Sequence, residues 1–265
     1  MSLRKRVDRR IERKETAYET DRLMRTKRSE EYDALEEVFD RSTLMIVYEF
    51  MNKGTIDEIH GVVSAGKEAR VYWGKDINGN ELAIKIYLTL SAEFRKGIMR
   101  YIEADERFKG VRRDTRSLIF AWAQKEFRNL QQASRAKVRV PKPIIVKNNV
   151  LIMEFIGENG ANAPSMKELP PVNPEKTYAT LLSYLEKLYR KADLVHGDLS
   201  EYNVMIWKGR PVIFDVSQAV PTSHPMAGFL LRRDLTNLNK FFSRLGAKVL
   251  SIEECYRKVT TGVGN

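Results

Sequence analysis

The chain has 265 residues, of which 43% are hydrophobic and 31% charged, so it can bury a sizeable core and is not disordered throughout. Its formal net charge of +11 favours contact with polyanions such as RNA, DNA or an anionic membrane surface, without choosing among them. The sequence contains no apolar stretch of membrane-spanning length, no apolar segment of a signal peptide, and only one cysteine, Cys255. We therefore expect a cytoplasmic protein without a membrane partner, an intramolecular disulfide or a cysteine metal cluster.

The first 45 residues are rich in Arg, Lys and Glu with sparse apolar positions, which predicts a basic helical extension. Residues 58–88 then alternate β-branched and aromatic residues around the turn "INGN", and this pattern predicts three antiparallel strands. Residues 89–113 are charged and weakly periodic, so we expect a mobile loop there.

A long helix is predicted after Asp114, which is a good N-cap residue. Its apolar positions fall on roughly one helical face, which should pack on the sheet: Leu118, Trp122, Ala123, Phe127 and Leu130. Residues 144–157, "IIVKNNVLIMEFIG", indicate two more strands around an Asn148–Asn149 turn. Together these segments predict a five-stranded antiparallel sheet with one long helix.

Residues 159–173 have the composition of a loop and indicate a boundary between two lobes. Asn173 and Pro174 then open a helix whose stripe consists of Tyr178, Leu181, Leu182, Leu185 and Leu188. "NVMIW" and "PVIFDVS" predict a hairpin that turns at Lys208–Gly209, and the remainder has a helical pattern. The predicted organisation is an extension over 1–58, a sheet lobe over 59–155 and a mainly helical lobe over 156–265, which is an α+β fold.

A sheet lobe joined to a helical lobe is typical of enzymes that handle nucleotide phosphates, and phosphoryl transfer needs a cradle for the phosphates. "SAGKEARVY" places the small residues Ser64, Gly66 and Ala69 at the spacing of a glycine-rich loop, followed by Val71. Small residues let the backbone approach phosphate closely. Tight hairpins use the same residues, so this signal is weak by itself.

Phosphoryl transfer also needs a cation on the phosphates. Lys85 lies among apolar residues of a predicted strand, where an unpaired ammonium would be costly. Glu126, on the following helix, is its candidate ion-pair partner. The simpler alternative places both side chains on solvent-facing surfaces.

Phosphoryl transfer further needs metal ligands and a carboxylate that receives the proton of the acceptor. The segments "HGDLSEYN" and "VIFDVS" supply candidates for both. Asp198 and Asn203 can point into one cavity from a loop, and Asp215 ends an apolar strand shortly downstream. Amide and carboxylate oxygens suit Mg²⁺, and a second carboxylate can orient a hydroxyl. Turn or capping roles explain each residue singly, but not their order after Lys85 and Glu126. His196 is expected to support the loop through hydrogen bonds.

The chain resembles the RIO-type atypical protein kinases, and within them the first RIO subfamily. The resemblance rests on "SAGKEARVY", "LAIKIY", "HGDLSEYN", "IFDVSQAV" and "HPMAGFLLRRDLTNLNKFF". An "HGD" loop ending in Asn also occurs in aminoglycoside and choline phosphotransferases, but the residues after Asp215 resemble RIO proteins. The N-terminal part lacks a winged-helix pattern, which disfavours the second RIO subfamily.

The resemblance implies a two-lobed protein-kinase-like fold that binds ATP with Mg²⁺, or with Mn²⁺ as the alternative metal. Asp198 would be the catalytic residue, with Asn203 and Asp215 binding the metal. The resemblance also assigns the nucleotide contacts. The phosphate loop would consist of Ser64, Gly66 and Lys67, followed by Val71. Lys85, paired to Glu126, would contact the phosphates. The adenine pocket would comprise Met153, the backbones of Glu154 and Ile156, and Met205 as its floor.

Several positions depart from ordinary protein kinases. Gly197 replaces the usual arginine, Val216–Ser217 replaces Phe–Gly after Asp215, and no A-P-E sequence follows. The fold is therefore expected to be trimmed relative to ordinary protein kinases, and these departures disfavour binding of an extended peptide substrate. Two activities remain open: transfer of the γ-phosphate to a protein Ser or Thr hydroxyl, including autophosphorylation, or ATP hydrolysis through a phosphoaspartate at Asp198.

The resemblance further suggests a role in maturation of the small ribosomal subunit. Residues 125–147 carry seven Lys or Arg against the single acid Glu126, and we hypothesise that they contact pre-ribosomal RNA. A small-molecule phosphotransferase and a non-catalytic RNA-binding scaffold are the alternatives. The protein substrate is not identified by the sequence.

Overall fold

The computed structural model describes residues 39–88, 97–99, 101–102 and 104–262. Most of the expected basic extension, residues 1–38, lies outside this range, as do residues 89–96 of the expected loop. The chain divides into two compact units, residues 1–45 and residues 46–265. Helix α3 (Arg41–Asn52) runs across this division, and all further structure lies in the second unit.

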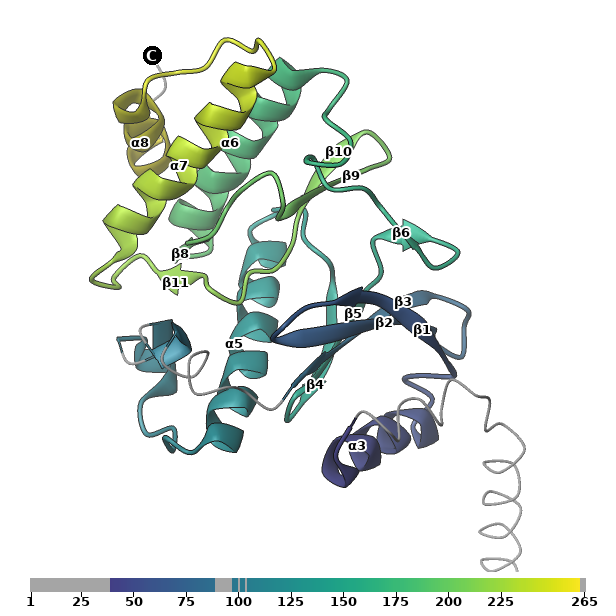
Figure 1. The fold of residues 1–265 in the computed structure, drawn as a ribbon. Coiled ribbons are helices and arrows are strands. Elements are labelled where there is room, and N and C mark those ends of the chain that lie inside the picture. The colour runs from purple at the N-terminus through teal and green to yellow at the C-terminus, as the bar shows by residue number, and fades with distance from the viewer. Residues whose placement is uncertain (1–38, 89–96, 100, 103, 263–265) are drawn as a thin grey trace, which may run out of the picture. The chain divides into compact units, whose positions relative to one another are not determined.

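The five-stranded antiparallel sheet is confirmed, with strand order β1-β2-β3-β5-β4 (Figure 1). Its strands are β1 (Glu58–Ala65), β2 (Ala69–Lys75), β3 (Glu81–Tyr87), β4 (Pro143–Lys147) and β5 (Val150–Glu154). The β2–β3 turn is closed by Asp76, whose carboxylate accepts the backbone N–H groups of Asn78 and Asn80 at 2.8 Å each. β5 is almost wholly buried, because the sheet lies against helix α5.

Helix α5 (Thr115–Arg135) is the predicted long helix, and Asp114 caps it by accepting the N–H of Ser117 at 2.9 Å. Leu118, Trp122, Ala123 and Leu130 of the predicted stripe are buried, and Phe127 is half-buried. Three polar side chains of α5 are buried as well: Lys125, Glu126 and Asn129. The alternative that put Glu126 on the solvent side is therefore wrong.

Part of the segment expected as a loop is helical, so that expectation is wrong for its helical residues and holds for the turns and irregular residues at 104–105 and 109–113. Residues 97–99 and 101–102 are helical, and a 3-10 turn, η1, spans Glu106–Phe108. Ile98, Tyr101 and Ile102 recur at helical spacing and are buried. The ring of Tyr101 lies 6.0 Å from that of Trp122 on α5, so packing against this helix orders a segment whose charged residues hide its short apolar stripe.

The remaining chain is mainly helical, as predicted. Its helices are α6 (Pro174–Lys191), α7 (Ala227–Arg244) and α8 (Ile252–Thr261), which lie side by side in Figure 1. Asn173 caps α6, Pro174 occupies its first turn, and the predicted apolar stripe of this helix is buried. The described residues include no helix long and apolar enough to cross a bilayer.

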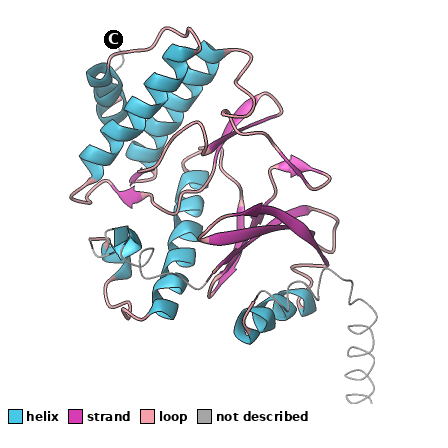
Figure 2. Ribbon diagram, viewed as in Figure 1, coloured by secondary structure: helices cyan, strands magenta, loops and turns pink. Residues whose placement is uncertain are grey.

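The short strands of this part lie nearest the sheet (Figure 2). The predicted hairpin is confirmed as β9 (Val204–Trp207) and β10 (Arg210–Ile213). Two further pairs were not predicted: β8 (Leu194–Val195) with β11 (Val220–Pro221), and β6 (Gly157–Glu158) with β7 (Ala161–Asn162). Two-residue strands have no detectable period, so a sequence pattern cannot reveal them.

Candidate active site

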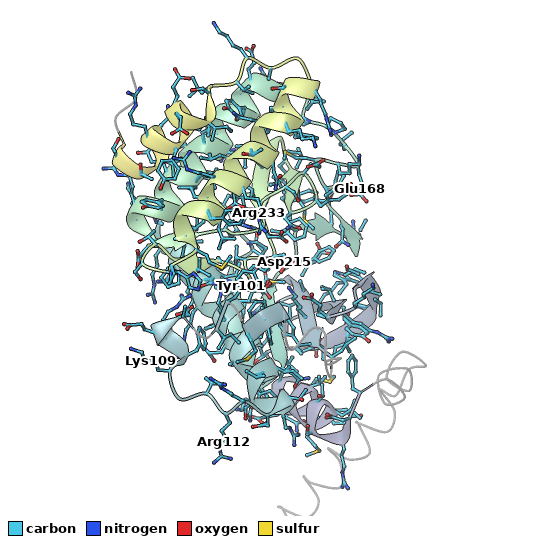
Figure 3. All side chains as sticks on the ribbon, turned by 60° about the vertical axis from the view of Figure 1, so that its left-hand side comes forward. Tyr101, Lys109, Arg112, Glu168, Asp215 and Arg233 are labelled. Carbon is cyan, nitrogen blue, oxygen red and sulfur yellow. The ribbon has the colours of Figure 1, made fainter. Side chains whose placement is uncertain are left out.

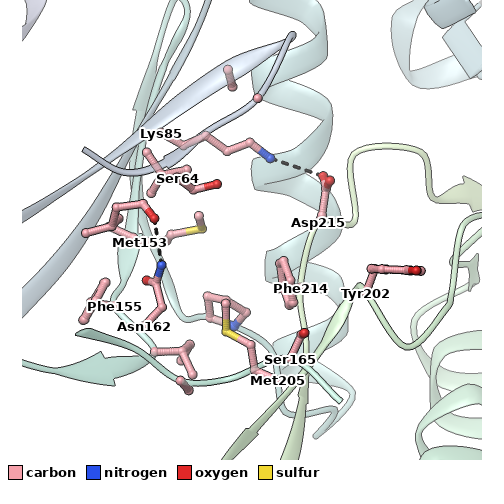
Figure 4. Close-up of a pocket in the computed structure, with 18 of the residues that line it drawn as sticks. Ser64, Lys85, Met153, Phe155, Asn162, Ser165, Tyr202, Met205, Phe214 and Asp215 are labelled. Atoms are coloured by element: carbon pink, nitrogen blue, oxygen red, sulfur yellow. Dashed lines mark hydrogen bonds and ion pairs between the residues drawn. The ribbon is translucent and has the colours of Figure 1, made fainter. Parts of the chain in front are cut away.

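A pocket of about 850 Å³ opens between the sheet and the β9–β10 hairpin (Figure 4). Most of the residues singled out from the sequence line it: Ser64, Gly66, Lys67, Val71, Lys85, Glu126, Met153, Glu154, Ile156, Asp198, Met205 and Asp215. Asn203 is not among the residues that line this pocket, but it is hydrogen-bonded to Asp198, which does line it. The structure thus gathers residues from both lobes around one cavity.

The β1–β2 connection forms one wall of the pocket. The Gly66 N–H donates to the Ala69 carbonyl at 3.0 Å and closes a tight turn that leaves Ser64 and Lys67 exposed at the rim. Val71 lies directly opposite Lys85 in the β2–β3 register, so the two side chains share the face that lines the pocket. A small-residue turn above a lysine is an arrangement that can cover phosphates.

The expected ion pair between Lys85 and Glu126 is present. Lys85 Nζ lies 2.8 Å from a carboxylate oxygen of Glu126 and 3.2 Å from Oδ1 of Asp215. Burial opposes the charge on Lys85, but Asp215 and Glu126 raise its pKa well above the usual range. Burial also raises the pKa of Glu126, whose side chain is 1% exposed. Lys85 therefore stays charged and joins the sheet, helix α5 and the loop of Asp215.

Asp215 follows β10 with φ 53°, a left-handed conformation that is uncommon for a residue other than glycine. Its side chain is 43% exposed toward the pocket, and Figure 4 shows it directed at Lys85. Burial would raise the pKa of Asp215, but Lys85 and the hydroxyl of Ser217, which donates to Oδ1 at 3.0 Å, keep it below the ordinary value. The carboxylate is therefore ionised and aimed into the cavity.

Asp198 also lines the pocket, with its side chain 47% exposed. Asn203 Nδ2 donates to the backbone carbonyl of Asp198 at 2.8 Å, which leaves the amide oxygen of Asn203 as its remaining polar atom. Gln218 Nε2 donates to Asp198 Oδ2 at 3.2 Å. These contacts hold the backbone and one carboxylate oxygen of Asp198, whose side chain still lines the cavity.

His196 supports the loop through hydrogen bonds, as expected. Its Nδ1 accepts the Asp198 N–H at 3.3 Å, so Nε2 carries the proton and donates to the Phe214 carbonyl at 3.4 Å. Burial lowers the pKa of His196 to about 4, which keeps the ring neutral near pH 7. A neutral imidazole bonded on both sides is a structural brace between the two loops.

Sequence reasoning missed Asp234 and Arg233 of helix α7. Asp234 is fully buried and accepts the N–H groups of Gly197 at 2.8 Å and Leu199 at 2.9 Å, while Arg233 donates to the Gly197 carbonyl. Figure 3 shows Arg233 on this helix above the level of Asp215. The available signal was a carboxylate within the apolar stripe of an amphipathic helix, since Leu230, Leu231, Leu235 and Leu238 flank Asp234.

The inner end of the pocket is apolar, with Met153, Ile156 and Met205 among its lining residues. The Glu154 side chain turns away to Arg139, whose guanidinium lies 2.6 Å from its carboxylate, so only the backbone of Glu154 is available in the cavity. Asn162, also a lining residue, donates to the Val63 carbonyl at 3.0 Å and ties β7 to β1 (Figure 4). The lining is suited to a flat, weakly polar ring.

The outer end of the pocket carries excess negative charge. Glu68, Asp198 and Asp215 line it with Lys67 and Lys85, and burial together with Asp215 raises the pKa of Glu68 to about 7. Within the described ranges, no group of three or more His, Cys, Asp or Glu side chains could hold a metal ion. The Asp215 carboxylate is a hard oxygen donor in this lining, and Asn203, although outside the lining, has an amide oxygen of the same kind; these two side chains could hold a hard cation.

An antiparallel sheet with a lysine–glutamate pair, placed over a loop carrying Asp198 and Asn203, defines a protein of the kinase-like class. The RIO domain model matches residues 70–255. The chain is 41% identical to the RIO-type serine/threonine-protein kinase Rio1 of Haloferax volcanii over 91% of this chain and 82% of that protein. The chain therefore belongs to the RIO family, as its resemblance to the first subfamily predicted.

A human relative and a solved structure are similar to this chain as well. The chain is 37% identical to the human serine/threonine-protein kinase RIO1, and the match covers 90% of this chain and 42% of the human protein. It thus spans less than half of that relative. The Rio2 kinase crystal structure from Chaetomium thermophilum superposes with a TM-score of 0.65 at 23% identity, covering 83% of this chain and 67% of Rio2.

A second structure of that Rio2, an ADP/Mg²⁺–phosphoaspartate complex, has a TM-score of 0.62 at 20% identity and covers 83% of this chain and 65% of Rio2. At these identities the superpositions establish the fold alone. The two-lobed kinase-like fold expected from the sequence is thereby confirmed.

Proposed function

We propose that this chain is an ATP- and Mg²⁺-dependent atypical serine/threonine kinase, an ATPase, or both, with the pocket as its active site. The observation that carries the proposal is the meeting of Lys85, Asp198 and Asp215 at one end of a single cavity whose other end is apolar. The family supports it, because relatives are named serine/threonine-protein kinases.

The adenine base would occupy the apolar end, against Met153 and above Met205. The Glu154 N–H already donates to the Lys142 carbonyl at 2.8 Å, and the Ile156 carbonyl already accepts the Ala163 N–H at 2.9 Å. The base would therefore use the Glu154 carbonyl as acceptor and the Ile156 N–H as donor. Phosphates would then extend beneath the turn of Ser64, Gly66 and Lys67 toward Lys85.

Asn203 and Asp215 would hold the metal, with the amide oxygen of Asn203 and a carboxylate oxygen of Asp215 as ligands. Mg²⁺, or Mn²⁺ with the same oxygen donors, would neutralise charge on the phosphates when bound. Lys85 would hold a phosphate oxygen through its ammonium. Its two carboxylate partners keep that ammonium charged and in place.

Asp198 can serve either activity. As a base it would accept the proton of a Ser or Thr hydroxyl while the oxygen attacks the γ-phosphorus. As a nucleophile, its carboxylate oxygen would attack the γ-phosphorus, the bond to the β–γ bridging oxygen would break, and ADP would leave. Water would then hydrolyse the acyl phosphate to regenerate Asp198. The phosphoaspartate named in the Rio2 complex supports the second route.

The deciding experiment incubates the protein with Mg²⁺ and γ-labelled ATP and treats the labelled protein with hydroxylamine, which cleaves acyl phosphates and spares phosphoserine. Label that is lost to hydroxylamine and absent from Asp198→Asn identifies Asp198 as the nucleophile. Label that resists hydroxylamine but requires Asp198 indicates transfer to hydroxyls. Absence of both labelling and ATP turnover would contradict the proposed function.

A cytoplasmic role in small-subunit maturation, through contact with pre-ribosomal RNA, remains part of the proposal. The basic stretch 125–147 is less available than its composition suggests, because Lys125 is buried and Arg139 and Lys147 pair with Glu154 and Glu49. Besides Lys147, which is exposed but pairs with Glu49, the exposed basic positions of the stretch are Arg128, Arg135, Lys137 and Lys142. RNA affinity that falls with salt, and falls further when these four are neutralised, would support the contact.

A further inference from the structure

Helix α5 buries two polar side chains that the proposed chemistry does not use. Lys125 and Asn129 are both 0% exposed and lie one helical turn apart, so they share a face of the helix. That face is directed at the backbone that follows Asp215. Glu126, the partner of Lys85, is the next residue after Lys125.

Lys125 Nζ donates to the carbonyl of Ser217 at 2.9 Å and also to the carbonyl of Ala219. Among the described residues it forms no ion pair, and its ammonium lies 5.3 Å from the centre of the Trp122 ring. Burial lowers the pKa of Lys125 to about 7. A fully buried lysine is costly, so a role confined to filling space would be served better by an apolar side chain.

Asn129 continues the same set of bonds. Its Nδ2 donates to the carbonyls of Val216 at 2.8 Å and Ala219 at 3.1 Å, while its Oδ1 accepts Nη1 of Arg107 at 2.9 Å. Arg107 comes from the η1 turn and is itself held by Asp105, at 2.7 Å. Lys109 and Arg112 nearby point outward (Figure 3), whereas Arg107 turns in toward α5, where it contacts Asn129 and Gln132.

The carbonyls of residues 216, 217 and 219 are thus held by donors from α5. They belong to the turn that begins directly after Asp215, and Ser217 within it donates to Asp215 Oδ1 at 3.0 Å. A shift of this backbone would therefore move the carboxylate that faces Lys85. Because α5 also carries Glu126, one rigid helix sets the positions of both groups that contact Lys85.

We propose that Lys125 and Asn129 are positioning residues that clamp the backbone of residues 216–219 to helix α5 and thereby aim the Asp215 carboxylate at the metal. This inference rests on the proposed function, because it takes Asp215 as a metal ligand. Arg107 supports the clamp by fixing the amide of Asn129. The clamp acts on metal binding and leaves the adenine end of the pocket untouched.

The test uses Lys125→Met, which keeps the length of the side chain and removes its donors. Lys240→Met is the matched control, since Lys240 is exposed on α7 outside the pocket. Binding of a fluorescent non-hydrolysable ATP analogue is first measured in EDTA. The EDTA is then removed, and Mg²⁺ is titrated into the metal-free complex of protein and analogue. We expect affinity in EDTA to stay within about twofold, and the Mg²⁺ concentration for half-saturation to rise about 10-fold or more in Lys125→Met only.

Asn129→Asp provides a second, isosteric variant. It retains the acceptor toward Arg107 but turns the donor toward Val216 and Ala219 into an oxygen, so the same rise in the Mg²⁺ requirement is expected. If Lys125→Met does not fold, this variant decides the question. If a folded variant binds Mg²⁺ as the wild type does, whatever its thermal stability, the residue is merely structural and the inference is overturned.

A double-mutant comparison gives a readout that a structural role would not change. In an Asp215→Asn background the clamp has no metal-binding carboxylate to aim, so Lys125→Met should cause no further loss of Mg²⁺ affinity. Additive losses would contradict the clamp. Failure of the wild type to bind the nucleotide at all would instead contradict the proposed function, which separates the two failures.

Discussion

The carboxylate of Asp234 accepts the backbone N–H of Gly197 at 2.8 Å, and its second oxygen accepts that of Leu199 at 2.9 Å. A single side chain of helix α7 therefore holds the residues on both sides of Asp198. Since each amide points into the protein, the loop has its conformation only while both acceptors are present.

Asp234→Asn should therefore lower ATP turnover by about 10-fold or more, because one N–H of the loop would face an amide NH₂ in place of an oxygen. Turnover of γ-labelled ATP measures the effect. Thr236→Ala, an exposed position on the same helix, is the control and should leave turnover unchanged. Normal turnover in Asp234→Asn would show that the loop keeps its form without this acceptor.

Asp234 also predicts a pH dependence of stability. Burial raises its pKa from 3.8 to about 7, so the folded state retains a proton that the unfolded state releases. The stabilising contribution of this proton is complete below about pH 4 and is lost as pH rises through 7. Urea unfolding at pH 5 and pH 8.5 should show a loss in the wild type that is smaller in Asp234→Asn. Equal losses would place the pKa of Asp234 near its ordinary value.

The ion pair of Lys85 and Glu126 allows stability and activity to be separated. Lys85→Met leaves the buried Glu126 unpaired, so we expect the free energy of unfolding to fall by about 3 kcal/mol and ATP turnover by about 100-fold or more. Adding Glu126→Gln removes the unpaired charge and should restore much of the stability, but none of the turnover. Recovery of turnover in the double variant would exclude a role for Lys85 on the phosphates.

Gly160 tests the hairpin beside the pocket. It has φ +77°, and a Cβ there would lie 3.0 Å from the Trp73 ring, whereas Gly79 has φ +78° with nothing within 4 Å. Gly79→Ala should cost about 1 kcal/mol from the left-handed backbone alone. Gly160→Ala should cost more and weaken nucleotide binding, because it displaces the β6–β7 hairpin that carries Asn162. Equal losses of unfolding free energy in Gly160→Ala and Gly79→Ala would show that the Trp73 ring moves aside without an energetic cost.

Local signals made much of the fold predictable. Alternating strands, the N-caps Asp114 and Asn173, and the apolar stripe of α6 are encoded by residues close together in the chain, and the structure contains each of them. The order of Lys85, Glu126, Asp198, Asn203 and Asp215 was likewise visible, since these residue types follow the needs of phosphoryl transfer.

Other features depend on contacts between distant segments. Tyr101, in the helical residues 101–102, packs beside Trp122, and β8 pairs with β11, which lies far along the chain. In the sequence, Lys125 and Asn129 look like ordinary polar residues of an amphipathic helix, and Asp234 differs only by its place within an apolar stripe. Only the tertiary structure shows that backbone groups from remote loops meet them in the interior.

The sequence by itself thus determined the sheet, the main helices and the residue types of the site, because hydrophobic period, capping and chemistry act locally. The tertiary structure decided which polar side chains are buried and which backbone groups they hold. The physical reason is that a buried donor or acceptor needs a partner, and the chain supplies that partner from wherever packing brings it.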